Sequence, residues 1–223
     1  MRLLPLLLLS GCIVQGGIIL DDFNRPDGPG LGPNWTAQVG NAEILGNRAR
    51  AQNAAGTSYL LTYNGVASDT ASVDVYVAGT DLAYIALVLG YGGGSNYFIK
   101  VQNQSGDSFF HNYAFYRGNN SEGGPFSTLG SPFSSGRITA SYSGTAASLA
   151  IDSNFDGVSE QFYSYNYSGS APTGSGIGLG FWGSAQADNF GIPGGASIPE
   201  PSSLTLAAGG LTALLLAWRR LIH

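Results

Sequence analysis

Oxygen-bearing side chains in one short segment have the types and spacing of a calcium loop. Asp152-Ser153-Asn154-Phe155-Asp156-Gly157 places Asp, Asn and Asp on alternate residues, and an EF-hand's glutamate position is occupied by Tyr163. Hard oxygen ligands on alternate residues can converge on one Ca²⁺, and the glycine allows a sharp turn. The expected ligands are Asp152, Asn154, Asp156 and Glu160. The alternative is a β-hairpin turn in which these residues serve backbone geometry alone.

Aromatic residues recur along Phe109–Arg117 at a spacing that suits a sugar-binding surface. In a strand, alternation would place Phe109, His111, Tyr113 and Phe115 on one face. Sugar sites combine aromatic platforms with hydrogen-bonding amides and acids. One face of such a strand must also pack against the core. The four residues therefore predict either a glycan-binding face or part of the interior of a sandwich.

The residue types needed for nucleophilic catalysis are scarce. His111 is the only histidine apart from the terminal His223, and the only cysteine is Cys12. No Gly-x-Ser-x-Gly nucleophile elbow lies between a strand and a helix. The adjacent Asp21 and Asp22 would point to opposite faces of a strand. We therefore expect no catalytic residues.

Strands must position these side chains, because the composition favours strands and turns over helices. The 223 residues include 34 glycines, and no stretch of the body has helical periodicity. Short apolar or alternating runs recur between Gly, Asn and Ser residues, which is typical of strands and turns. The expected strands are 71–77, 82–91, 97–102, 109–117, 137–142, 147–151, 161–165, 176–182 and 187–190. They predict an all-β antiparallel β-sandwich (jelly roll) over residues 18–193, with Gly118–Ser135 as the longest loop.

The charge balance excludes one class of partner. Nine Lys and Arg residues and fourteen Asp and Glu residues give a net charge of −5, and Lys100 is the only lysine. An acidic surface repels phosphate backbones, so we expect no nucleic acid partner. Because Cys12 is the only cysteine, the body has no disulfide and no cysteine metal site.

Residues 1–17 have the pattern of a signal peptide. One positive charge at Arg2 precedes a leucine run and then small residues. Leu9-Ser10-Gly11-Cys12 also resembles a bacterial lipobox, in which the cysteine is lipidated and becomes the new N-terminus. The alternative is an ordinary signal cut around residues 15–17, with Cys12 discarded.

The C-terminal segment 194–223 combines an apolar run with a basic end. As a helix, residues 204–218 would span roughly 22 Å, against about 30 Å of hydrocarbon core. We expect a short transmembrane helix, with Arg219 and Arg220 on the cytoplasmic side under the positive-inside rule. That orientation puts the body outside the membrane.

Together with Pro199-Glu200-Pro201-Ser202, this run and the terminal Arg219-Arg220 resemble the PEP-CTERM sorting tail of Gram-negative bacteria. The resemblance implies recognition by an exosortase, cleavage near the motif, transient anchoring in the inner membrane and association with exopolysaccharide. The tail is also labelled an ice-binding protein C-terminal domain, a label that concerns the tail and not the body. The alternative is a plain C-terminal membrane anchor.

The body resembles the concanavalin A-like lectin and glucanase (LamG-like) sandwich. The resemblance is carried by Asp22-Phe23-Asn24-Arg25-Pro26-Asp27-Gly28, Leu31-Gly32-Pro33-Asn34-Trp35, Gly178–Gly183 and Asp188-Asn189-Phe190. It implies a fold with adjacent first and last strands, and more weakly carbohydrate binding. Glucanases of this fold carry Glu-x-Asp-x-x-Glu on a strand, because glycoside cleavage needs paired carboxylates. That motif is absent here, since the glutamates before the tail are Glu43, Glu122 and Glu160.

These patterns predict an exported, non-catalytic protein of the cell surface or extracellular matrix of a Gram-negative bacterium. We expect a lectin-like sandwich that associates with exopolysaccharide, with calcium as the one candidate cofactor. Two alternatives are a purely structural surface protein without a specific ligand and a polysaccharide-active enzyme. An ice-binding role ranks below these, because no regular Thr-x-Thr ladder occurs.

Overall fold

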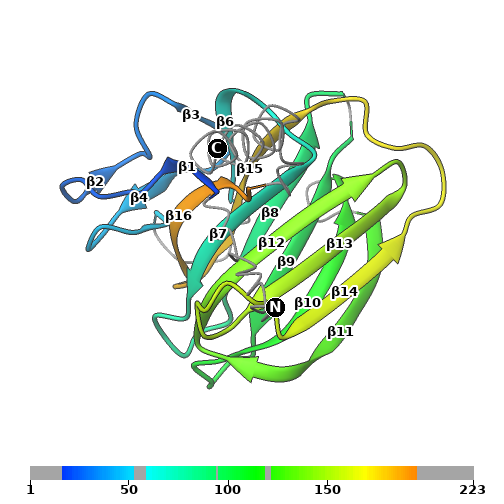
Figure 1. Ribbon diagram of the computed structural model, residues 1–223. Coiled ribbons are helices and arrows are strands. Elements are labelled where there is room, and N and C mark those ends of the chain that lie inside the picture. The colour runs from blue at the N-terminus through cyan, green and yellow to red at the C-terminus, as the bar shows by residue number, and fades with distance from the viewer. Residues whose placement is uncertain (1–16, 53–58, 94, 119–121, 195–223) are drawn as a thin grey trace, which may run out of the picture. The chain divides into compact units, whose positions relative to one another are not determined.

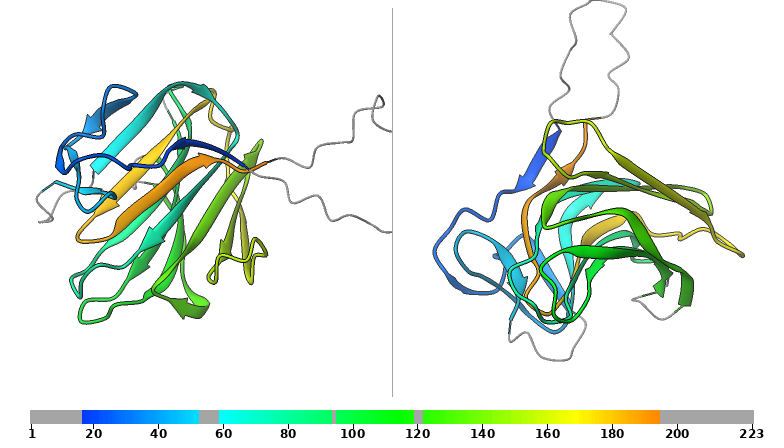
Figure 2. Two further views of the ribbon diagram at one scale, coloured as in Figure 1. Left: turned by 60° about the vertical axis from the view of Figure 1, so that its left-hand side comes forward. Right: turned by 90° about the horizontal axis from the view of Figure 1, so that it is seen from below.

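Two antiparallel sheets packed face to face form the body of the protein (Figure 1). The computed structural model describes residues 17–52, 59–93, 95–118 and 122–194. The expected all-β antiparallel sandwich is confirmed. Figure 1 looks onto one sheet with the other behind it, and Figure 2 shows the same two layers from two further sides.

The sheet in front in Figure 1 has nine strands in the order β14-β13-β12-β7-β16-β5-β4-β2, with β1 also paired to β16. The bounds are β1 (Ile18–Asp21), β2 (Gly28–Pro29), β4 (Ala42–Ile44), β5 (Ala49–Ala51), β7 (Thr70–Tyr76), β12 (Ser135–Ser143), β13 (Ala146–Asp152), β14 (Gln161–Asn166) and β16 (Gln186–Ile192). Alternation gives this sheet one apolar and one polar side. In β7, Val73 and Val75 are fully buried against the second sheet, and Asp74 points the other way.

The second sheet has seven strands in the order β11-β10-β9-β8-β15-β6-β3. The bounds are β3 (Trp35–Val39), β6 (Tyr59–Ala67), β8 (Tyr84–Tyr91), β9 (Tyr97–Asn103), β10 (Phe110–Arg117), β11 (Glu122–Phe133) and β15 (Gly176–Trp182). Every residue of β8 except Tyr91 is buried, as expected for an apolar strand covered on both sides. This sheet therefore has two apolar faces, only one of which meets the nine-stranded sheet.

The first and last strands are neighbours, as the family resemblance implies. Ile18 pairs with Ile192 in an antiparallel ladder between β1 and β16. Beside this ladder, the Trp35 ring lies 5.9 Å from the Phe23 ring and 5.0 Å from the Phe190 ring, measured between centroids. Aromatic packing thus joins the two ends of the body inside the sandwich.

The expected loop Gly118–Ser135 is wrong for most of its length. Strand β11 occupies Glu122–Phe133 and pairs with β10 at the edge of the seven-stranded sheet. Its Gly, Pro and Ser residues give no alternating pattern, and its register to β10 shifts twice. Edge strands tolerate proline and bulges, so pairing with β10 rather than local preference creates this strand.

Candidate functional site

The outer face of the seven-stranded sheet carries a cluster of apolar side chains separate from the main core. Its buried members are Leu60, Tyr84, Ala86, Val88 and Phe98, and its partly exposed members are Tyr91, Tyr116 and Trp182. Lys100 lies among them, on the same side of β9 as Phe98. We call these nine residues the aromatic face.

Ring packing holds the aromatic face together. The Tyr84 ring stacks on Trp182 with centroids 6.1 Å apart and meets Phe98 edge-on at 5.8 Å. Gly180 on β15 leaves the space that the Phe98 ring fills, because a Cβ at position 180 would lie 2.4 Å from that ring. A larger residue at position 180 would therefore displace Phe98.

Lys100 is the charged group of the aromatic face. Its side chain is buried, and its Nζ lies 4.4 Å from the centroid of Tyr84 and 4.9 Å from that of Tyr116. Within the described residues it makes no ion pair and no hydrogen bond. Desolvation by burial lowers the pKa of Lys100 to about 8. The two ring faces stabilise the cation in part, since cation–π contacts favour the charged form.

Carboxylates are missing from the outward positions of the seven strands whose side chains the structure describes. These positions carry Lys100, apolar or aromatic residues, glycines, and uncharged polar residues such as Gln102 and Asn112. Hydrolysis of a glycosidic bond requires two carboxyl groups on opposite sides of it. The described part of this face offers hydrogen bonds and ring surfaces but no such pair.

Strand β10 does not present the expected set of four residues on one face. The register between β10 and β9 shifts between Phe110 and Asn112, which interrupts the alternation. Phe115 is fully buried in the core, and the half-buried Tyr113 stacks on Tyr163 with centroids 3.9 Å apart. Tyr113 and Phe115 therefore take the interior position that the sequence left open as the alternative, and the four residues do not share one exposed face. The outward residues of β10 are Asn112, Ala114 and Tyr116.

Phe109 and His111 lie at the start of β10, away from the other two. His111 Nε2 lies 2.5 Å from Asp107 Oδ2, and the Phe109 ring is 44% exposed. The hydrogen bond from His111 lowers the pKa of Asp107. This pair fixes the turn between β9 and β10, where Asn103 also donates to the Asp107 carbonyl oxygen. No third group completes a catalytic arrangement among the described residues.

The loop after β13, the candidate calcium loop, brings three of its four expected ligands together. One carboxylate oxygen from each of Asp152, Asp156 and Glu160 lies within 4.8 Å of the others. Asn154 donates from Nδ2 to Asp156 Oδ2 at 3.1 Å, and its Oδ1 accepts the N–H of Asp156 at 2.9 Å. Backbone N–H groups also donate to Asp152 and Glu160. The donor set fits a hard cation such as Ca²⁺, and the same residues shape the turn.

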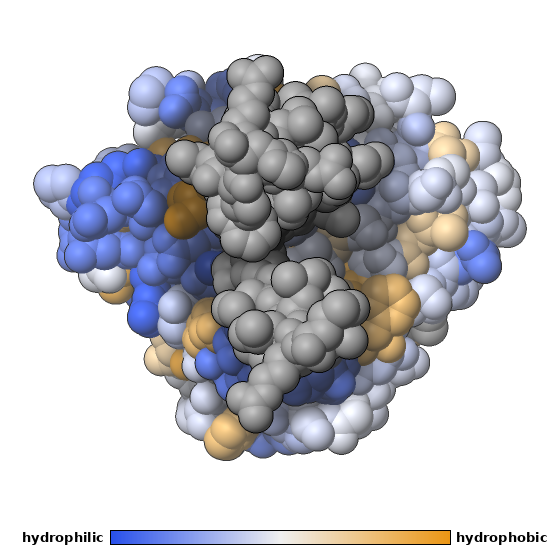
Figure 3. Space-filling view, in the orientation of Figure 1, coloured by the Kyte–Doolittle hydropathy of each residue, from blue (hydrophilic) through white to orange (hydrophobic). Residues whose placement is uncertain are grey.

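On the outer face of the nine-stranded sheet, two ion pairs join charged side chains of neighbouring strands. Arg137 donates to Asp74 from Nε at 2.6 Å and from Nη2 at 3.0 Å, and Asn189 Nδ2 adds a third bond at 2.9 Å. Glu43 and Arg50 form a second pair at 2.7 Å. We call the outward side of this sheet the paired-charge face. Where it is visible in Figure 3 the surface is mainly hydrophilic to neutral, with hydrophobic residues in separate patches.

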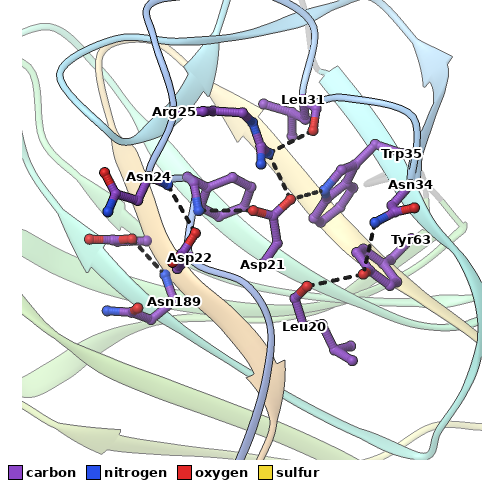
Figure 4. A network of polar contacts seen from close by, with 12 residues as sticks. Leu20, Asp21, Asp22, Asn24, Arg25, Leu31, Asn34, Trp35, Tyr63 and Asn189 are labelled. Carbon is purple, nitrogen blue, oxygen red and sulfur yellow. Dashed lines mark hydrogen bonds and ion pairs between the residues drawn. The ribbon is translucent and has the colours of Figure 1, made fainter.

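A network of hydrogen bonds surrounds Asp21 at the end of β1 (Figure 4). The buried carboxylate accepts hydrogen bonds from Trp35 Nε1 at 2.6 Å, Arg25 Nη2 at 2.7 Å and the N–H of Phe23 at 2.8 Å. Arg25 Nη2 also donates to the Leu31 carbonyl oxygen at 2.7 Å. A shallow depression of about 430 Å³ opens beside this group. Because both oxygens of Asp21 already accept these bonds, the network fixes the chain corner and leaves no free base.

Known proteins resemble this chain in structure and not in sequence. No family model matches it, and no curated protein does. The exoplasmic/lumenal domain of VIP36, solved in a Ca²⁺/Man3GlcNAc-bound form, is 13% identical, with a TM-score of 0.50 and coverage of 79% of this chain and 89% of that chain. At this identity the likeness shows the fold alone, an antiparallel sandwich of two sheets.

Two glucanases are also similar. A β-glucanase of Bacillus licheniformis is 12% identical, with a TM-score of 0.49 and coverage of 76% of this chain and 94% of that chain. A β-1,3-glucanase from Mycobacterium marinum is 15% identical, with a TM-score of 0.48 and coverage of 83% and 94%. At these identities the likeness concerns the fold.

Several expected features lie outside the described residues. They are the signal segment with Cys12, the sorting motif Pro199-Glu200-Pro201-Ser202, the apolar run 204–218 and the terminal Arg219 and Arg220. Within the described part of the chain, no helix has the length and hydropathy needed to cross a membrane. The expectations for export, lipidation and sorting therefore stay predictions.

Sequence reasoning missed the residues that form the aromatic face. From the sequence, Lys100 contributes only to the charge balance, and Trp182 only to the closing motif Gly178–Gly183. One signal was present, because a single lysine between Phe98 and Gln102 interrupts an otherwise apolar strand. The rings that contact it, Tyr84 and Tyr116, come from distant segments, so these contacts depend on the register of three strands.

Proposed function

We propose that this protein is a non-catalytic carbohydrate-binding sandwich of the bacterial cell envelope, which associates with exopolysaccharide through the aromatic face. The observation that carries the proposal is the group of partly exposed rings, Tyr91, Tyr116 and Trp182, on one outer sheet face. Ring faces pack against the apolar faces of sugars, and neighbouring amides bond their hydroxyl groups. The lack of paired carboxylates among the described outward residues supports binding rather than cleavage.

Substitution of Trp182 tests the aromatic face. We expect Trp182→Ala in the full chain to weaken binding to the producer's exopolysaccharide by at least about tenfold, as loss of a ring at a binding centre typically does. Trp182→Phe should keep most of the affinity, because a ring remains. The matched control is Phe162→Ala, which removes a 68% exposed ring from β14 in the other sheet and should leave binding unchanged. Equal binding by all four proteins would refute the proposed face.

An enzyme acting on polysaccharide is the competing function. Release of reducing ends from the same polymers during long incubation would establish it. We expect none, and we expect bound polymer to be recovered at its original length.

We further propose that Ca²⁺ stiffens the loop between β13 and β14. The support is the convergence of Asp152, Asp156 and Glu160, whose oxygens would hold the ion and whose mutual repulsion it would neutralise. VIP36, a neighbour in fold, was solved in a Ca²⁺/Man3GlcNAc-bound form. The ion would supply rigidity and no chemical step.

Export and sorting complete the proposal. The support is the order of sequence features: an N-terminal signal pattern, the motif Pro199-Glu200-Pro201-Ser202, an apolar run and Arg219-Arg220. Intact mass of the protein from the producer's envelope and medium tests it. A C-terminus near residues 199–202 is expected, and acyl mass on Cys12 would add the lipobox. A full-length chain confined to the inner membrane would contradict sorting by an exosortase.

A further inference from the structure

We infer that Lys100 forms an anion subsite on the aromatic face, which selects sugars that carry a carboxylate or sulfate group. The inference rests on the proposed function, because it names the class of glycan that the same face would take. Its basis is the ammonium group of a buried side chain, which has ring contacts but no anionic partner in the described structure.

The arginines that the structure describes all have ion-pair or hydrogen-bond partners, and Lys100 differs from them in this respect. Arg25, Arg50 and Arg137 form ion pairs with carboxylates at 2.7, 2.7 and 2.6 Å. Arg48 donates to Gln186, and Arg117 donates to two backbone carbonyl oxygens. Lys100 alone among these cations makes neither an ion pair nor a hydrogen bond within the described residues. Its hydrogen-bond donors are therefore available to a ligand.

The ammonium group is accessible although the side chain is buried. The fully enclosed side-chain polar atoms without a hydrogen-bond partner in the described structure are Arg25 Nε and Asn96 Nδ2, and Lys100 Nζ is not among them. Lys100 as a whole residue is 5% exposed, and because Nζ is neither bonded nor among the enclosed atoms, the accessible part includes Nζ. Across the sheet its neighbours are Ala86 and Ala114, whose short side chains leave the tip uncovered.

Among the described residues of this face, Lys100 is the one charged side chain, so an anion is favoured beside it. The groups that face Lys100 from the neighbouring strands are the phenol rings of Tyr84 on β8 and Tyr116 on β10. No carboxylate from the described outward positions competes for the ammonium. The chain as a whole carries a net charge of −5, so an anionic polymer would be repelled elsewhere. A partly desolvated ammonium attracts an anion more strongly than a solvated one does.

The aromatic rings beside Lys100 indicate that the anionic group belongs to a sugar. Trp182 stacks on Tyr84, and Tyr84 lies 4.4 Å from Lys100 Nζ, so a partly exposed ring adjoins the rings that contact the ammonium. A pyranose stacked on Trp182 or Tyr116 could place a substituent at Nζ. The lysine ammonium is a compact point charge that can donate to a carboxylate or to a sulfate group. The ligand class is therefore a hexuronate or sulfated sugar, and not a neutral one.

Matched oligosaccharides test this subsite. The probes are oligogalacturonate, its carboxyl-reduced neutral counterpart and a sulfated galactan oligosaccharide, each titrated into the full chain with calcium chelated. We expect an anionic probe to bind at least about tenfold more tightly than the neutral one, as for hydrogen bonds to charged groups. Tighter binding of the galacturonate identifies a carboxylate site, and tighter binding of the sulfated probe a sulfate site. Lys100→Met should remove the difference, and Lys100→Arg should keep it.

A pH series separates a direct charge contact from a packing effect. The Lys100 ammonium loses its proton near its lowered pKa of about 8, so affinity for the anionic probe should fall from pH 8 to 10. Lys100→Arg should show no fall over this range, because arginine keeps its charge. A fall of equal size in both proteins would overturn the inference.

Failure of the inference and failure of the proposed function give different results. Equal affinity for neutral and anionic probes in the wild-type chain and in Lys100→Met would leave carbohydrate binding intact and refute the anion subsite. No binding to any polysaccharide, including the producer's own, would refute both.

Discussion

The two outer faces of the sandwich differ in the partners that their charged side chains have. On the strands of the nine-stranded sheet, Asp74 has Arg137 as its partner and Glu43 has Arg50. On the seven-stranded sheet, Lys100 lies between two tyrosine rings without a carboxylate partner in the described structure. Paired charges on a solvated face maintain solubility and add little to binding. A desolvated charge without a partner lowers stability, so its presence indicates a use on the aromatic face.

The faces differ in packing as well. On the paired-charge face, Ser141 and Ser148 exchange a hydrogen bond at 2.7 Å, and Arg137 is 46% exposed. On the aromatic face, Phe98 is 1% exposed, although it points away from the main core. The aromatic face is thus a second small core whose rim of partly exposed rings is free to meet a ligand.

Phe98→Ala should produce the largest effect and sharpen this contrast. Removing a ring from a closed apolar cluster costs about 3–5 kcal/mol of unfolding free energy, from lost burial and the cavity left behind. Phe162→Ala, which removes a 68% exposed ring from the paired-charge side, should change stability by less than about 0.5 kcal/mol. Urea denaturation followed by fluorescence measures both. Similar losses in the two variants would show that the aromatic face is not a second core.

Arg137→Met should have the next largest effect, on the opposite face. It leaves the carboxylate of Asp74, whose side chain is 5% exposed, with Asn189 as its remaining side-chain donor. Loss of a partner to a buried charged group costs about 1–3 kcal/mol. Arg50→Met breaks a pair in which Glu43 is 22% exposed, so it should cost less than about 1 kcal/mol. An equal cost for both arginines would mean that burial does not set the strength of these pairs.

Lys100→Met should raise stability at neutral pH, unlike either arginine substitution. The pKa of Lys100 in the folded chain, about 8, lies below its ordinary value of 10.5, so the unfolded chain binds more protons between these values. Wild-type stability therefore gains from pH 8 to 10.5, and this gain is absent in the variant. We expect Lys100→Met to be more stable by about 1–2 kcal/mol at pH 7, allowing for the solvent that reaches the ammonium.

The control for this measurement is the difference between the two proteins at each pH. Burial raises the pKa of Tyr97 and Tyr142, so ionisation of tyrosines in the unfolded chain lowers the stability of both proteins above pH 10. That common loss cancels in the difference, which should shrink as the pH passes from 8 to 10.5. A difference that stays constant with pH would mean that Lys100 is not desolvated.

The sequence allowed the class of fold and one loop to be predicted, because both depend on local patterns. Alternation identified β7, the apolar run identified β8, and the spacing of Asp152 and Asp156 identified a loop in which both carboxylates converge. The aromatic face depends on register instead. A shift at Phe110 moved Phe115 into the core, and no local pattern encodes that shift.

The candidate calcium loop offers the opposite charge to Lys100, and we expect the smallest effect there. Asp152, Asp156 and Glu160 bring three carboxylates together, and none of the three forms an ion pair within the described residues, just as Lys100 forms none. Ca²⁺ at tenfold excess over its dissociation constant should stabilise the chain by about 1 kcal/mol, seen as a rise in unfolding temperature that a chelator reverses. Asp156→Asn should abolish this response. Without Ca²⁺ the same variant should equal or exceed the wild type in stability, because it removes one repelling charge. Identical unfolding temperatures with calcium and with chelator would mean that these carboxylates only shape the turn. Lys100 would then be the only one of the two sites at which charge without a partner indicates a ligand.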